Sequence, residues 1–196
     1  MTLCINDHIE DMGERELEKA LSALPSWRRE KALRYRHQEG QLQSALAYAE
    51  LCHALTLSYG ILERPDFLWN EHGKPTLKHH PTIHFSMSHC QAAVGCMVAD
   101  RPCGFDIETM RSASDSLLEK TMNELERERI LNAPSPAMEF TRLWTRKEAV
   151  FKLKGTGITD SLHTVLQEAD EQGIQVQSLC NPFRGYVYST AITTIH

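Results

Sequence analysis

Two carboxylates, Asp106 and Glu108, stand two positions apart in a stretch where apolar and polar residues alternate. Side chains two apart on a strand point to the same face, so both carboxylates project together while Phe105 and Ile107 face the core. Adjacent carboxylates repel each other, and they either stay in water or share a cation. Oxygen ligands of this kind suit a hard ion such as Mg²⁺. The alternative is an exposed acidic strand end without a ligand.

A second pair of charged residues, Glu148 and Lys152, is four positions apart in a stretch with helical spacing of apolar side chains. Residues at i and i+4 are neighbours on a helix surface, so the carboxylate and the ammonium group are expected to lie side by side. The pair is either an ordinary helix ion pair or part of a site for a charged ligand. Gly155 and Gly157 predict the end of this helix at Lys154.

Polar residues at two strand or turn positions form a third group. Ser88 and His89 stand at the end of a predicted strand, where neighbouring side chains point to opposite faces. The two therefore do not form a nucleophile and its base, and phosphate binding suits them better than hydrolysis does. Gly73, Lys74 and Pro75 predict a turn. By itself this turn is weak evidence of function, because it could be only structural.

Five basic residues crowd into nine positions near the N-terminus: Arg28, Arg29, Lys31, Arg34 and Arg36. The whole chain carries a formal net charge of −5, which argues against a general nucleic-acid binder. A local basic cluster in an acidic chain suits a compact phosphate-bearing ligand or an acidic partner. The alternative is a solvated helix face.

Composition and targeting signals indicate a cytoplasmic protein. The first eleven residues are polar and acidic, and no apolar run approaches the roughly 20 residues that span a bilayer. The six cysteines form no CxxC pair, so we expect reduced thiols and no structural zinc site.

Hydrophobic periodicity predicts an α+β fold with mostly antiparallel strand pairing. The predicted helices are 14–24, 41–59, 115–131 and 138–154, and residues 65–81 are expected to be loop-rich. The predicted strands are 2–5, 83–87, 91–98, 103–108, 163–167, 174–179 and 186–192, with a turn or short linker at 100–102.

In this order, four motifs resemble the 4′-phosphopantetheinyl transferase superfamily, and within it the surfactin-synthetase-activating type. They are Gly73-Lys74-Pro75, Phe85-Ser-Met-Ser88-His89-Cys90, Gly104-Phe-Asp106-Ile-Glu108 and Trp144-Thr-Arg-Lys147-Glu148-Ala149-Val-Phe-Lys152, followed by Gly155-Thr-Gly157-Ile158. The resemblance is firm over residues 73–158 and weaker over residues 28–55. Ser86 and Cys90 replace the family's usual asparagine and serine. Gly40 and Gln43 stand where the family often has aspartate and arginine, which removes one expected coenzyme A phosphate contact.

The resemblance implies two similar α+β halves related by pseudo-twofold symmetry, with coenzyme A in the cleft between them. The N-terminal half would comprise residues 1–100. The C-terminal half, residues 101–196, would carry the metal-binding carboxylates. The family's carrier contact lies mostly around the helix that follows the metal-binding strand, where Arg111, Arg127 and Arg129 are found.

The resemblance also implies a reaction. The 4′-phosphopantetheine group of coenzyme A would move to a serine of an apo acyl or peptidyl carrier protein, and 3′,5′-ADP would leave. Asp106, Glu108 and Glu148 would hold Mg²⁺, and Glu148, Lys152 and Asp106 would be catalytic. The coenzyme A contacts carried over from the family are Arg28, Lys31, Lys74, Pro75, Ser88, His89 and Lys152.

Two other functions remain open at this point. One is an inactive homologue that binds coenzyme A or a carrier, and the other is a metal-dependent phosphodiesterase that uses the same carboxylates. The expected partners are coenzyme A and a carrier protein, with no nucleic acid and no membrane, and the chain is expected to be a monomer. The sequence does not indicate which carrier is served.

Overall fold

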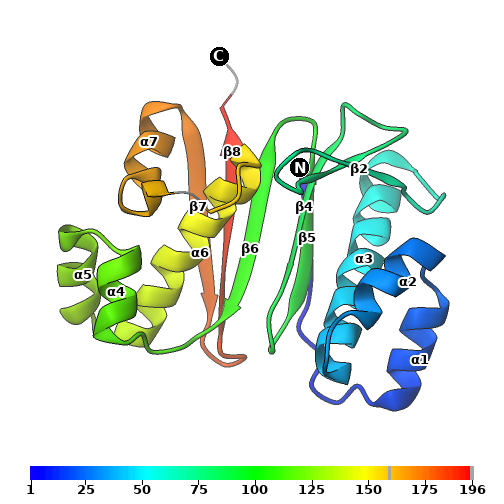
Figure 1. The fold of residues 1–196 in the computed structure, drawn as a ribbon, viewed down its shortest axis with the longest axis horizontal. Helices are drawn as coiled ribbons and strands as arrows, with labels where there is room; N and C mark the ends of the chain where they lie inside the picture. The colour runs from blue at the N-terminus through cyan, green and yellow to red at the C-terminus, as the bar shows by residue number, and fades with distance from the viewer. Residues whose placement is uncertain (159, 195–196) are drawn as a thin grey trace.

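A computed structural model describes residues 1–158 and 160–194 of the chain. The fold is α+β, as predicted: two three-stranded antiparallel sheets stand side by side in the middle of the molecule, and helices cover their outer sides (Figure 1). Helices α1 to α3 lie on one side of this pair of sheets, and α4 to α7 lie on the other. Within the described residues, no helix combines the length and apolar character needed to cross a membrane.

The first sheet is built from N-terminal strands in the order β1-β5-β4. Its elements are β1 (Thr2–Asn6), α1 (Glu14–Ser22), α2 (Ser26–Leu33), α3 (Gln38–Tyr59), the hairpin of β2 (Phe67–Trp69) and β3 (Pro75–Leu77), β4 (His84–His89) and β5 (Val94–Ala99). Helix α3 ends at Gly60, whose φ of 67° is the left-handed conformation of a helix C-cap. Its fully buried residues Leu51 and Leu55 pack in one core with Phe85 and Val98 of the sheet.

The second sheet has the order β6-β8-β7. Its elements are β6 (Cys103–Thr109), α4 (Asp115–Thr121), α5 (Glu124–Leu131), α6 (Pro136–Lys154), the 3₁₀ turn η1 (Asp160–His163), α7 (Val165–Glu171), β7 (Ile174–Asn181) and β8 (Tyr186–Thr193). In both sheets the first strand along the chain pairs with the last, and the last pairs with the one before it. The chain passes from one sheet to the other between β5 and β6, at residues 100–102.

The two sheets meet where β4 runs beside β6. The Ser86 hydroxyl donates a hydrogen bond across this junction to the carbonyl oxygen of Phe105, at 3.3 Å. Fully buried side chains from both sheets, among them Met97, Phe105 and Ile107, form one apolar cluster behind the junction. This packing fixes the end of β4 against the strand that carries the paired carboxylates.

Several sequence-based boundaries are wrong. The predicted helix 115–131 is two helices, because Asn123 leaves the helical conformation and caps α5. The Asn123 side chain accepts from the Glu126 backbone at 2.9 Å, and the Glu126 carboxylate accepts from the Asn123 backbone at 2.9 Å. The predicted strand 163–167 is instead the end of η1 and the start of α7, where Val165 and Ala169 are buried at helical spacing. The sequence analysis also missed α2 and the β2–β3 hairpin.

Candidate functional site

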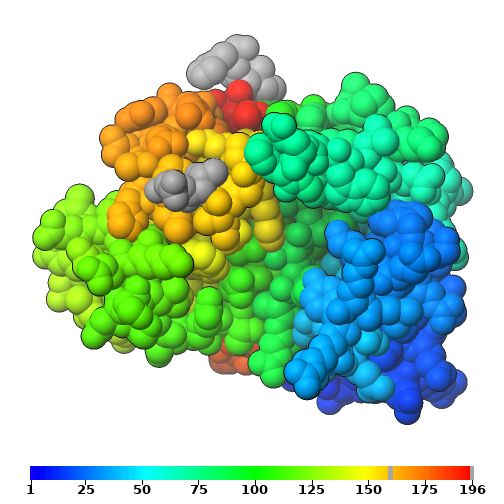
Figure 2. Space-filling model, viewed as in Figure 1, coloured from blue at the N-terminus to red at the C-terminus, as the bar shows by residue number. Residues whose placement is uncertain are grey.

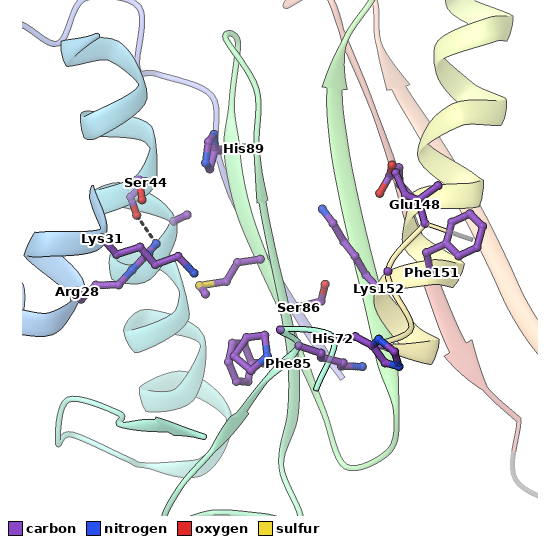
Figure 3. Close-up of a pocket in the computed structure, with 18 of the residues that line it drawn as sticks. Arg28, Lys31, Ser44, His72, Phe85, Ser86, His89, Glu148, Phe151 and Lys152 are labelled. Carbon is purple, nitrogen blue, oxygen red and sulfur yellow. Dashed lines mark hydrogen bonds between the residues drawn. The ribbon is translucent and has the colours of Figure 1, made fainter. Parts of the chain in front are cut away.

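A cavity of about 340 Å³ lies between the N-terminal helices, β4 and the C-terminal part of α6. In the space-filling view the surface is hollowed between the blue N-terminal helices and yellow α6 (Figure 2). Seven of the predicted site residues line it: Arg28, Lys31, Lys74, Pro75, His89, Glu148 and Lys152. In the close-up view, Arg28 and Lys31 lie on one side of the gap and Glu148 lies on α6 at the other (Figure 3).

Asp106 is the centre of a polar cluster beside this cavity. It is only 3% exposed, and its Oδ1 accepts hydrogen bonds from Lys152 Nζ at 2.6 Å and from the Ser88 hydroxyl at 2.8 Å. Lys152 Nζ also lies 2.8 Å from the Ser88 oxygen. The other carboxylate oxygen, Oδ2, is buried and has no hydrogen-bond partner among the described residues. Three elements, β4, β6 and α6, therefore converge on one carboxylate that still has an unused acceptor.

Glu108 and Glu148 share the electrostatic environment of Asp106. Burial raises the pKa of Glu108, and the charge of Asp106 raises it further. Burial also raises the pKa of Glu148, to about 7, with repulsion from Asp106 and Glu108 adding to the shift and attraction from Lys152 opposing it. Asp106 and Glu108 thus both repel negative charge on Glu148, and Lys152 only partly offsets them. Carboxylate oxygens are the ligands that a hard divalent cation prefers, but the ligand atoms of these three residues do not all lie within 4.8 Å of one another.

The expected ion pair between Glu148 and Lys152 is not the contact that Lys152 makes in the described structure. Its ammonium group reaches across to Asp106 on β6 instead of lying against Glu148 on its own helix. Spacing along one helix predicted that the two residues are neighbours, but it carried no information about the strand packed against them.

Ser88 and His89 serve different neighbourhoods, as adjacent strand residues predict. Ser88 contacts Asp106 and Lys152 and does not line the cavity, although the resemblance named it with His89 among the coenzyme A contacts. His89 Nε2 lies 3.2 Å from the hydroxyl of Tyr35, a residue that the sequence analysis did not single out. Burial lowers the pKa of His89 to about 4, and the charges of Lys152 and Arg28 contribute to that shift.

The N-terminal basic cluster divides into one inward and several outward side chains. Arg28 is 5% exposed, donates to the Ser44 carbonyl oxygen at 2.7 Å and lies over the ring of Tyr48. Burial lowers its pKa. Lys31 also lines the cavity, whereas Arg34 and Arg36 are exposed and lie outside its lining. Arg28 therefore shapes the cavity wall, and Lys31 adds a positive charge to it.

The Gly73-Lys74-Pro75 turn belongs to the β2–β3 hairpin and docks on the end of α6. Lys74 Nζ donates to the Leu153 carbonyl oxygen at 2.7 Å, and burial lowers the pKa of Lys74. Asn70 supports the turn, because its side chain accepts from the Lys74 backbone at 2.8 Å and donates to the Gly155 carbonyl oxygen at 2.9 Å. An N-terminal hairpin and the C-terminal end of α6 are thereby joined along one wall of the cavity.

Lys147 is a charged residue that the sequence analysis named only as part of the motif from Trp144 to Lys152. It is fully buried, and its Nζ donates to the Glu126 carboxylate at 2.6 Å and to the carbonyl oxygens of Thr121 and Leu162. One side chain thus ties α6 to α4, α5 and η1 directly beside Glu148. A lysine in an otherwise apolar helix stripe was the available signal for this anchor.

Among the described residues, one group of three potential metal ligands has its ligand atoms close together, and it lies away from the cavity. Atoms of Cys4, Glu50 and His53 come within 4.8 Å of one another, on β1 and α3, and none of the three lines the cavity.

Comparisons with known proteins agree with the motifs. The family model for the 4′-phosphopantetheinyl transferase superfamily matches residues 102–192. The chain is 28% identical over 169 residues to 4′-phosphopantetheinyl transferase psf-1 of Bacillus pumilus, covering 84% of this chain and 72% of that protein. It is 26% identical over 178 residues to the transferase Sfp of Bacillus subtilis (strain 168), covering 87% and 79%. It is 33% identical over 116 residues to the transferase AcpT of Salmonella typhi, covering 54% and 57%.

Proposed function

Because this chain belongs to the 4′-phosphopantetheinyl transferase superfamily, surfactin-synthetase-activating type, we propose that it transfers 4′-phosphopantetheine from coenzyme A to a serine of an apo acyl or peptidyl carrier protein. The observation that carries this proposal is the convergence of Asp106, Glu108, Glu148 and Lys152 beside a cavity with basic walls. The anionic cluster would hold a cation and the basic residues would hold phosphates, as a coenzyme A site requires.

The carboxylates fit a Mg²⁺ ion held by Asp106, Glu108 and Glu148. The buried Oδ2 of Asp106 supports this assignment, because a cation would supply the partner that the described residues do not. The raised pKa values of Glu108 and Glu148 are compatible with it, since burial first, and then neighbouring carboxylates, disfavour their ionised forms when no cation is present. When bound, Mg²⁺ would neutralise the diphosphate and stabilise charge that develops on its oxygens.

The chain's own residues would bind and orient the substrate. Lys152 would attract the diphosphate from its place between Asp106 and Ser88. At the far end of the cavity, Lys31, Lys74 and His89 would hold the 3′-phosphate and adenine end, against walls formed by Arg28 and Pro75. Positioning and charge stabilisation of this kind supply most of the catalysis in phosphoryl transfer.

The transfer would begin when the carrier serine hydroxyl attacks the phosphorus nearer to pantetheine. The new bond joins the serine oxygen to that phosphorus, and the bond to the leaving phosphate oxygen breaks, so that 3′,5′-ADP departs. The serine proton must be accepted, and Glu148 is the proposed base. A positioned carboxylate can accept a proton in general base catalysis.

We also propose that residues 1–100 and 101–196 are similar halves related by a pseudo-twofold axis. Each begins with a strand, continues through helices and ends with two strands, and the strands pair in the same order in both. The cavity would then be the coenzyme A cleft between the halves. We further propose that the chain acts as a cytoplasmic monomer whose partners are coenzyme A and the carrier, without nucleic acid or membrane.

The test is incubation of a panel of apo-carriers with coenzyme A and Mg²⁺, read by mass spectrometry. We expect one phosphopantetheine group per carrier serine, together with free 3′,5′-ADP. The Asp106→Ala variant should lose transfer by about 100-fold or more at saturating Mg²⁺, because the diphosphate loses its metal bridge. Release of 3′,5′-ADP without carrier would indicate a phosphodiesterase, and coenzyme A binding without any turnover would indicate an inactive homologue.

A further inference from the structure

Tyr35 and His89 make a contact that joins the helical layer to the end of β4. Tyr35 lies in the turn between α2 and α3, and its hydroxyl is 3.2 Å from His89 Nε2. The two rings meet edge to face, with centroids 5.6 Å apart and an angle of 69° between their planes. Both residues line the cavity, so the contact is part of the proposed coenzyme A site.

This contact determines which nitrogen of His89 is left for a ligand. A neutral imidazole carries one N–H donor and one acceptor nitrogen. Burial, with the charges of Lys152 and Arg28, lowers the pKa of His89 to about 4, so the ring is neutral near pH 7. When the Tyr35 hydroxyl donates to Nε2, the proton must be on Nδ1. Nδ1 makes no hydrogen bond within residues 1–158 and 160–194.

Gly40 makes room for the Tyr35 ring. A β-carbon on Gly40 would lie 2.9 Å from Cδ1 of Tyr35 and 3.2 Å from its Cβ. Gly40 is the third residue of α3 and has no positive φ, so backbone conformation does not require glycine there. Gln41 completes the arrangement, because its amide donates to the Tyr35 carbonyl oxygen at 2.9 Å. The replacement of the family's usual aspartate by Gly40 thus has a local steric explanation in Tyr35.

We propose that Tyr35 is a positioning residue for coenzyme A: its hydroxyl holds His89 in the tautomer that offers Nδ1–H to a phosphate of the substrate. A proton on Nδ1 makes the ring a donor toward an anion, whereas the other tautomer would present a lone pair and repel it. This inference rests on the proposed function, since it assumes that coenzyme A occupies the cavity.

The first test compares Tyr35→Phe with wild type by calorimetric titration of coenzyme A in the absence of carrier. The variant keeps the ring and loses only the hydroxyl. We expect the Kd and the KM for coenzyme A to rise about two- to tenfold, with the carrier KM unchanged. Tyr186→Phe is the matched control, because its hydroxyl donates to Asp7 at 3.1 Å and it does not line the cavity. A Tyr35→Phe variant that binds coenzyme A as tightly as wild type would overturn the inference.

The second test asks which nitrogen of His89 is used. The side-chain amide nitrogen of His89→Asn can replace Nδ1, whereas that of His89→Gln can replace Nε2. We expect His89→Asn to keep coenzyme A affinity within a few-fold of wild type and to be insensitive to Tyr35→Phe, and His89→Gln to bind at least tenfold more weakly. The reverse order would overturn the tautomer assignment.

Gly40→Ala provides an independent test, because it alters Tyr35 without adding a group to the cavity. Alanine favours the helix more than glycine does, so a loss of stability is not expected from α3 itself. We expect its coenzyme A affinity to fall about as far as that of Tyr35→Phe, and an unchanged affinity would contradict the role of Gly40. If wild type itself does not bind coenzyme A, the proposed function fails. If wild type binds coenzyme A and both Tyr35→Phe and Gly40→Ala bind it equally well, only the Tyr35 inference fails.

Discussion

Gly104 on β6 lies against α6 so closely that a β-carbon on it would stand 1.9 Å from the carbonyl oxygen of Ala149. The same β-carbon would be 2.6 Å from the backbone nitrogen of Leu153. Gly104 shares a strand face with Asp106, because the two are two residues apart. The missing side chain at Gly104 therefore permits the separation of β6 and α6 at which Lys152 reaches Asp106 at 2.6 Å.

Gly104→Ala should damage both stability and activity. The clash is with main-chain atoms, so no side-chain rotation relieves it and α6 must move away from β6. Overpacking of this kind costs about 1–3 kcal/mol, and a backbone contact places the cost at the upper end of that range. Denaturant unfolding and transfer assays measure the two effects. Gly13→Ala is the control for the steric clash, because its β-carbon would meet only the Glu16 carboxylate, at 3.7 Å. It should cost only what alanine costs at the N-cap of α1, and transfer should stay normal. Normal stability with normal transfer would show that the close approach has no consequence.

Lys152→Ala should weaken coenzyme A binding and turnover together. The variant removes the ammonium group from Asp106 and leaves Ser88 as the remaining donor to Oδ1 among the described residues. The Lys152 side chain is 31% exposed, so we expect a loss of only about 1–2 kcal/mol of stability in the metal-free protein. Added Mg²⁺ should restore stability without restoring turnover. Lys154→Ala is the control on the same helix, since it breaks only the ion pair with Glu168. A lower melting temperature with unchanged kinetic constants would show that Lys152 stabilises the fold without acting on coenzyme A.

The sequence predicted those parts of the site that depend on periodicity within one element. Alternation over residues 103–108 predicted a strand with Phe105 and Ile107 inside, and β6 confirms it, with both side chains fully buried. The long helices α3 and α6 were predicted to within three residues at each end, because their apolar spacing is sustained and a glycine follows each of them. Periodicity gave no partner for Lys152, since that partner lies on a strand distant in the sequence.

Short elements were the ones predicted wrongly, for physical reasons that differ. The break before α5 depends on one capping residue, Asn123, whose signal was outweighed by the surrounding helical pattern. The segment 163–167 is too short for a period to be read from it, and burial of Val165 against neighbouring helices and strands determines its helical form. The sequence analysis missed Tyr35 because its contacts are with Gly40 and with His89, and His89 is 54 positions away in the sequence.

Glu148 should make the stability of the metal-free protein depend on pH. Its pKa is raised from 4.5 to about 7, so the folded state keeps a proton that the unfolded state loses between these values. The resulting stabilisation is complete below pH 4.5 and is lost as pH rises through 7. Relative to Glu148→Gln, wild type should therefore lose about 1–2 kcal/mol between pH 5 and pH 8, after allowance for partial exposure.

Denaturant unfolding at both pH values, in a chelator and in Mg²⁺, measures this difference. Mg²⁺ should abolish the difference, because a cation stabilises the ionised carboxylates. Glu168→Gln is the control, because hydrogen bonds from Thr164 and Lys154 lower the pKa of Glu168. The stability difference between wild type and Glu168→Gln should therefore change with pH in the opposite direction. A stability difference between wild type and Glu148→Gln that stays constant with pH would contradict the raised pKa.

The last prediction concerns where the carrier docks. We expect the proposed carrier to be acidic around its modified serine. Because this chain is itself net negative, a local positive patch would have to offset repulsion between the two proteins during encounter. One candidate set is Arg111, which precedes α4, with Arg127 and Arg129 on α5. The other is Arg29 on α2 with Arg34 and Arg36, which follow that helix. In the structure, Arg129 lies 2.6 Å from Glu139, so it is not a free charge.

Arg111→Glu with Arg127→Glu should therefore raise the carrier KM several-fold. The coenzyme A KM should rise less than the carrier KM, because neither arginine lines the cavity, although the charge of Arg111 acts on Glu108. Arg34→Glu with Arg36→Glu is the matched charge reversal at the other candidate surface, and it should change the carrier KM less. Added salt should reduce the difference in carrier KM between the Arg111→Glu, Arg127→Glu variant and wild type. The reason is that the Debye length falls from about 10 Å at 0.1 M to about 3 Å at 1 M. Both KM values, measured at low and high salt for each double variant, decide the matter. A larger rise in carrier KM for Arg34→Glu with Arg36→Glu would indicate that the carrier docks on the N-terminal helices. A coenzyme A KM that rises as much as the carrier KM in Arg111→Glu with Arg127→Glu would indicate that Arg111 and Arg127 contact the nucleotide.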